Sequence, residues 1–121
     1  MFNPQLFQPS QKQLYNFFLL APKACDLAVP EVFDAHFYLN TNPDLELANL
    51  HTPEQASSHW CNFGIKEGRQ GTSSFHSIQY LENYQDLRNA FGDNYEAAIV
   101  HYIKHGMEEG RKGIASGNSQ H

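Results

Sequence analysis

Apolar residues recur at helical spacing through most of the chain. The clearest stripes are Val32, Phe33, Phe37, Tyr38 and Leu39, and further on Tyr95, Ala98, Ile99, Tyr102 and Ile103. Residues three and four positions apart share one face of a helix. No stretch alternates apolar and polar residues for long enough to predict a strand. The pattern therefore predicts an all-α fold.

The pattern is used twice. Residues 33–74 align with residues 75–116 without a gap at an offset of 42, and fifteen of the 42 positions are identical. A fixed period of this length indicates one supersecondary unit in tandem. We therefore expect two helical-hairpin repeats. The predicted division is an N-terminal helical segment 1–29, repeat 1 at 30–74, repeat 2 at 75–115 and a flexible tail 116–121, all in one compact domain.

Proline and helix-capping residues predict the helix boundaries of repeat 1. Pro30 suits the opening of a helix. Asn42-Pro43 should interrupt that helix, because the residue before proline is pushed out of the α region. Thr52 and Gln55 have the spacing of a capping box. The helix that they start should run to about Gly64 or Lys66.

Repeat 2 follows the same plan with different caps. Ser77 is expected to cap a helix that runs through Tyr84. Gly92 suits a left-handed residue at the end of the next turn. Asp93 and Glu96 again have capping-box spacing.

Before the repeats, Leu14–Ala21 reads as a helix that is apolar nearly all round and is stopped by Pro22. It is too short for a membrane span. It also lacks the flanking residues of a signal peptide, so we expect it in the mature protein.

The net charge and the number of cysteines limit the classes of function that are compatible with the sequence. Eight Lys and Arg against thirteen Asp and Glu leave a net charge of −5, which argues against a nucleic-acid partner. Two cysteines, Cys25 and Cys61, allow at most one disulfide between them, and we expect buried free thiols.

The shared positions supply the expected core and its polar companions. The expected core residues are Tyr38, Leu39, Leu45, His59, Trp60, Tyr80, Leu81, Leu87, His101 and Tyr102. An acid and an arginine also recur 25 residues apart, as Asp44 with Arg69 and Asp86 with Arg111. A guanidinium has five N–H groups in a rigid fork, so we expect each arginine to fold back onto its acid or onto carbonyls. Gly68 and Gly110 would allow the reversal.

His101 and His105 lie four apart on one predicted helix, a spacing that can place two imidazoles on one metal. They are weak candidates, since Phe63 stands at the position equivalent to His105. The carboxylates of the repeats predict two separate similar sites rather than one acid–base pair. No catalytic residue and no cofactor is expected.

The motif Phe-x4-Tyr-Leu-x4-Asp-Leu, followed by His-Trp or His-Tyr-x3-Gly-x2-Glu-Gly-Arg, spans residues 33–113. It resembles a short tandem helical repeat found beside haemolysin-type calcium-binding repeats in secreted bacterial proteins. The same module is appended to polysaccharide glycosyltransferases of bacteria and giant viruses. The resemblance implies a secreted, cell-surface or virion setting. The calcium-binding nonapeptides themselves are absent from this sequence.

These observations favour a non-enzymatic, structural or accessory module that docks a protein or glycan partner within a larger assembly. The contact would be made by the apolar N-terminal helix or by a repeat face. The alternative is a metal-binding protein or metalloenzyme that uses His101 and His105.

Overall fold

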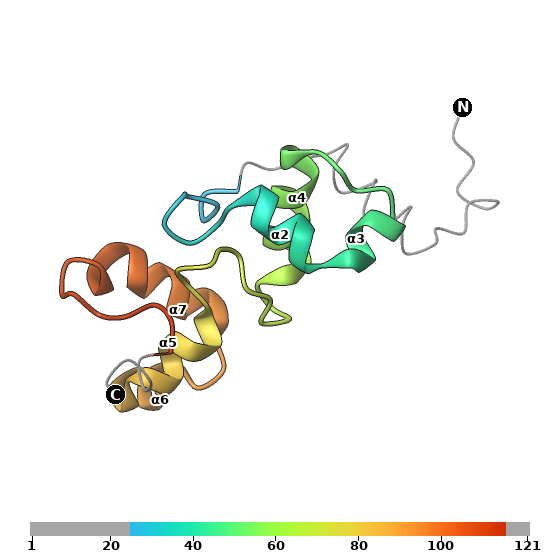
Figure 1. The fold of residues 1–121 in the computed structure, drawn as a ribbon. Helices are drawn as coiled ribbons and strands as arrows, with labels where there is room; N and C mark the ends of the chain where they lie inside the picture. The colour runs from blue at the N-terminus through green and yellow to red at the C-terminus, as the bar shows by residue number, and fades with distance from the viewer. Residues whose placement is uncertain (1–24, 116–121) are drawn as a thin grey trace.

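The structure, a computed structural model, describes residues 25–115 (Figure 1). Repeat 1 contains α2 (Ala35–Thr41), α3 (Pro43–Leu47), α4 (Pro53–His59) and the π-helical turn η1 (Trp60–Gly64). Repeat 2 contains α5 (Ser77–Asn83), α6 (Gln85–Phe91), α7 (Tyr95–His101) and η2 (Tyr102–Gly106). Each element of repeat 2 begins 42 residues after its counterpart in repeat 1.

The described part of the chain is helical, and its only β feature is an isolated bridge between Thr72 and Phe75. The predicted all-α class is confirmed. Each repeat contains three α-helices, since α3 and α6 are separate from the helices that precede them. No helix within residues 25–115 has the length and apolarity of a membrane span. The expected helix Leu14–Ala21 and the expected tail 116–121 lie outside the described residues.

Two boundary predictions for repeat 1 hold and one is wrong. Asn42 leaves the helical region with φ −129° and ψ 77°, so α2 ends there and α3 begins at Pro43. Thr52 and Gln55 form the predicted capping box at α4. The first helix does not open at Pro30: it begins at Ala35, because the Asp34 carboxylate accepts hydrogen bonds from the first free backbone N–H groups.

In repeat 2, two predicted caps are displaced by one residue. His76 is the N-cap of α5, and Ser77 is the first helical residue. Asn94, rather than Asp93, caps α7, where its side chain accepts a hydrogen bond from the Ala97 N–H at 3.1 Å. Gly92 ends α6 at φ 61°, as predicted.

Each repeat closes on its own beginning. The Asp34 N–H donates to the Gly71 carbonyl at 2.9 Å, and the His76 N–H donates to the Gly113 carbonyl at 2.8 Å. A Cβ on Gly71 would collide with the Val32 carbonyl oxygen. Glycine at the exit thus lets each repeat bring its last residues back against its first.

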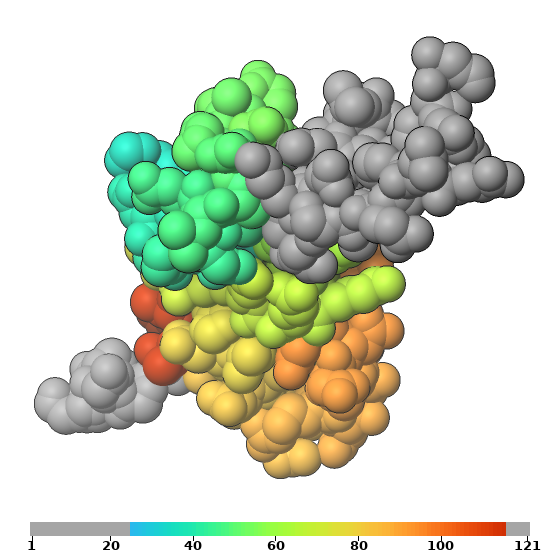
Figure 2. All heavy atoms as spheres, turned by 90° about the vertical axis from the view of Figure 1, so that its right-hand side faces the viewer, coloured from blue at the N-terminus to red at the C-terminus, as the bar shows by residue number. Residues whose placement is uncertain are grey.

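The two repeats lie one above the other, with the end of repeat 1 against repeat 2 (Figure 2). A Cβ on Gly68 would press on the side chains of Ile78 and Tyr95. The Gly68 carbonyl and the His76 Nε2 lie 3.0 Å apart in a hydrogen bond. The exit turn of repeat 1, around Gly68, is therefore the surface on which repeat 2 packs.

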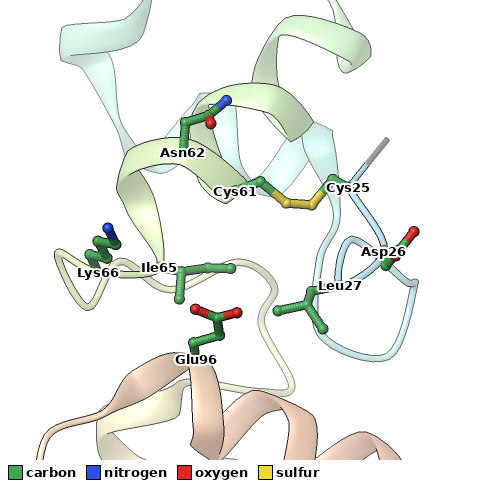
Figure 3. Close-up of a pocket in the computed structure, with 8 residues that line it drawn as sticks. All are labelled: Cys25, Asp26, Leu27, Cys61, Asn62, Ile65, Lys66 and Glu96. Atoms are coloured by element: carbon green, nitrogen blue, oxygen red, sulfur yellow. A yellow bond between two sulfur atoms is a disulfide. The ribbon is translucent and has the colours of Figure 1, made fainter. Parts of the chain in front are cut away.

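Cys25 and Cys61 are joined in a disulfide, with Cα atoms 6.0 Å apart (Figure 3). This corrects the expectation of free thiols. Sequence separation alone gave no measure of the distance between the two Cα atoms. The bond fastens the segment before α2 to the π-helical turn of repeat 1.

Replacing Cys25 or Cys61 by Ser should lower the free energy of unfolding by about 4 kcal/mol, because the bond closes a 36-residue separation in the unfolded chain. Denaturant titration checks the value. A reductant should lower the stability of the parent and leave the Ser variants unchanged. A parent that unfolds identically with and without reductant would show that the bond contributes nothing.

Candidate functional site

A tyrosine–histidine hydrogen bond, buried in repeat 1 and partly buried in repeat 2, connects the helices of each repeat. The Tyr38 hydroxyl and the His59 Nδ1 lie 2.8 Å apart, and the Tyr80 hydroxyl and the His101 Nδ1 also lie 2.8 Å apart. Each bond joins the first helix of a repeat to the end of its third helix, across 21 residues. The recurrence of this spacing in the sequence was the signal that could have predicted the bond.

The same hydroxyls require glycine in the π-helical turns. A Cβ on Gly64 would overlap the Tyr38 hydroxyl, and a Cβ on Gly106 would overlap the Tyr80 hydroxyl. The glycine lets the turn approach the ring directly. The invariance of this glycine between the repeats thus has a packing cause.

The arginine of each Glu-Gly-Arg exit folds back onto the acid of its own repeat. Arg69 donates to both carboxylate oxygens of Asp44, at 3.0 and 2.9 Å, and its Nε donates to Glu67 at 2.7 Å. Arg111 binds both oxygens of Asp86 at 3.1 and 3.0 Å and donates to Glu109 at 2.8 Å. The expected return of each arginine onto its acid is therefore found in both repeats.

A third contact distinguishes the two arginines. Arg69 also donates to the Asn42 side-chain oxygen at 2.8 Å. At the equivalent position in repeat 2 the Arg111 guanidinium stacks over the Tyr84 ring, 4.7 Å from its centroid. Sequence reasoning missed both partners, because Asn42 and Tyr84 are not alike.

The paired hydrogen bonds from each arginine to its aspartate, which we call the arginine forks, also shift the pKa values of nearby groups. The hydrogen bonds from Arg69 hold the pKa of Asp44 below its usual range, and Arg111 does the same for the pKa of Asp86. Burial lowers the pKa of His59 to about 4, and the nearby Arg69 charge acts in the same direction. The carboxylates are thus ionised and occupied by guanidinium groups, which leaves them poorly suited to acid–base work.

The residues expected in the core divide into two groups. Seven are buried: Tyr38, Leu45, His59, Trp60, Tyr80, Leu81 and Leu87. Leu39, His101 and Tyr102 are half-buried against that core. Phe33 stacks on Trp60 with ring centroids 4.8 Å apart, and Phe75 lies 4.6 Å from Tyr102 in the same place in repeat 2.

The weak metal candidates His101 and His105 come together on the surface of repeat 2. Their ring centroids lie 5.5 Å apart. They border an open groove of about 520 Å³ beside Phe91, Val100 and Lys104. Among residues 25–115, no group of three metal-ligating side chains converges.

The exit turn of repeat 1 packs against repeat 2, whereas the equivalent turn of repeat 2 is exposed. Ile65 is 4% exposed, whereas Met107, its equivalent in repeat 2, is 37% exposed. Gly68 packs against Ile78 and Tyr95, whereas, apart from its chain neighbours, no atom of residues 25–115 lies within 4 Å of a Cβ built on Gly110. We call Met107 and Gly110 the end face of repeat 2.

A smaller pocket of about 260 Å³ lies beside the disulfide (Figure 3). Leu27, Ile65 and Glu96 line it, from the segment before α2, the exit of repeat 1 and α7 respectively. Its walls are those of the junction between the repeats, so its shape follows from their stacking.

Comparison of the chain with protein-family models, with curated proteins and with solved structures found no match. The resemblance to the tandem helical repeat therefore stays a proposal that rests on the motif.

Replacing Arg69 by Lys should lower the free energy of unfolding by about 1 kcal/mol, because lysine keeps the charge but cannot bond both oxygens of Asp44. Arg111→Lys should act in the same direction. Chemical denaturation measures both. Lys104→Arg, at an exposed position, serves as the neutral control. Arginine variants that unfold like the parent would show that the forks do not stabilise the fold.

The thermal midpoint should fall as the pH drops from about 6.5 to about 4. The unfolded chain takes up a proton on His59 in this range, while the folded chain, with its lowered pKa, does not. As the pH falls below 3.8, the ordinary pKa of an aspartate, the loss of the Asp44 charge should lower the midpoint further. Asp44→Asn should make the second decline smaller and leave the first unchanged, because Asp86 still contributes to the second. A midpoint constant from pH 6.5 to pH 4 would contradict the burial of a neutral His59.

Proposed function

We propose that this chain is a non-enzymatic interaction module built from two copies of one helical hairpin-like unit. The end face of repeat 2 docks a protein partner. The proposal rests on one observation: repeat 1 uses the equivalent exit turn to seat repeat 2, while Met107 and Gly110 remain open. A surface already suited to packing against helices is then available to a partner.

A protein partner fits the exposed chemistry better than a glycan does. Within residues 25–115 the large exposed apolar side chains are Leu47, Met107 and Ile114, and none of them is aromatic. Flexible thioether side chains are over-used at protein-binding surfaces. The motif resembles modules that accompany larger bacterial and viral proteins. By that resemblance, we propose that the chain is an accessory part of a larger assembly.

The disulfide supports an oxidising compartment as the place of action. Cystines persist in secreted and cell-surface proteins and are rare where glutathione keeps thiols reduced. We therefore place the module outside the reducing cytosol, in agreement with the secreted setting that the resemblance implies.

The test uses three baits in extracts of the cells that make this protein: the parent, Met107→Glu and Leu47→Glu. A charge in the end face should weaken capture of the partner by at least about tenfold, the scale of a central interface residue. Leu47 is 85% exposed on α3 of repeat 1, outside the end face of repeat 2, and serves as the control.

A partner captured by the parent and by Leu47→Glu, but lost with Met107→Glu, supports the proposal. Identical sets of proteins on all three baits would refute the end face as the docking surface. Equal thermal midpoints of the three baits would establish that the loss is not due to unfolding.

A further inference from the structure

The groove along α7 and η2 is bordered by two imidazoles, and the folding of the repeat requires only that of His101. His105 is exposed, and it follows the half-buried His101 by one turn. In repeat 1 the equivalent pair is His59 and Phe63, with ring centroids 5.3 Å apart. A phenyl ring thus fills the same place in the other copy of the unit, so the second imidazole has no structural necessity.

The spacing of the two rings suits a shared metal ion. An ion about 2.1 Å from a ring nitrogen lies about 3.2 Å from the centre of that ring. Two imidazoles on one tetrahedral ion then have centres about 5.3 Å apart. The observed separation of His101 and His105 is 5.5 Å. We propose that His101 and His105 bind one divalent transition-metal ion on the surface of repeat 2.

Tyr80 occupies one ring nitrogen of His101 and leaves the other for a ligand. Its hydroxyl is hydrogen-bonded to Nδ1 of His101, which leaves Nε2 for the metal. A hydroxyl oxygen accepts as readily as it donates, so a proton on Nδ1 is accommodated while Nε2 carries the ion. Fixing one ring nitrogen so that the other faces the metal is the usual arrangement around protein-bound metals.

The donor set selects the class of ion. Imidazole suits copper, zinc and nickel, and copper(II) binds such sites most tightly. Because no third His, Cys, Asp or Glu joins the pair within residues 25–115, water completes the coordination. Lys104 borders the same groove and adds a positive charge, so the affinity should be moderate. Hard ions such as Mg²⁺, which prefer oxygen ligands, should not bind.

The experiment titrates the oxidised full chain with Cu²⁺, Zn²⁺ and Mg²⁺ by calorimetry, and records the electron paramagnetic resonance spectrum with one equivalent of Cu²⁺. The variant His105→Phe copies the residue that repeat 1 carries at this position, and His105→Gln keeps a polar side chain. His51→Ala removes an exposed histidine elsewhere and serves as the control.

We expect one Cu²⁺ or Zn²⁺ per chain, with nitrogen couplings from imidazole in the copper spectrum. Both His105 variants should bind at least about tenfold more weakly, since even the loss of an outer-shell partner costs about 10–100-fold. His51→Ala should bind like the parent, and all variants should retain the parent thermal midpoint. Equal affinity of the parent and both His105 variants, or no binding of either ion by the parent, would overturn the site.

Discussion

The contact between a tyrosine hydroxyl and a histidine ring is the constraint around which each repeat is built. Tyr38 and His59 connect the first helix of repeat 1 to its third, and Gly64 is needed because the hydroxyl occupies the space of a side chain. The buried hydroxyl of Tyr38 and the Nδ1 of His59 satisfy each other, which removes the penalty that either atom would incur alone. The surrounding aromatic rings then pack against a fixed polar pair.

Much of the fold follows from local sequence signals. The helical period, the break at Asn42-Pro43 and the capping box of Thr52 and Gln55 all act over a few residues, so they were predictable. The start of α2 was not, because Pro30 and the Asp34 carboxylate offer competing openings and the burial of Val32 and Phe33 decides between them. The tyrosine–histidine bonds and the disulfide join residues 21 and 36 positions apart. Their geometry exists only after folding.

The two repeats share their internal contacts and differ in which side chains they expose. Internal comparison revealed the forks of Arg69 and Arg111, because both members of each pair recur in the sequence. It gave no indication of the open end face, since Met107 is a conservative counterpart of Ile65. What distinguishes them is the presence of repeat 2 over one and not over the other. The exposure of a position thus depends on what packs over it, which the residue type alone does not reveal.

The disulfide also limits how far the chain can be drawn out. A force applied between residue 25 and the end of repeat 2 passes directly from Cys25 to Cys61 through the sulfur bridge. The residues between them bear no load, which removes about 120 Å of contour length from the extensible chain. Repeat 2 has Ile103 at the position of Cys61 and carries no such bridge. Under tension, within residues 25–115, the span between Cys25 and Cys61 therefore cannot lengthen, whereas repeat 2 can be drawn out to its full contour length.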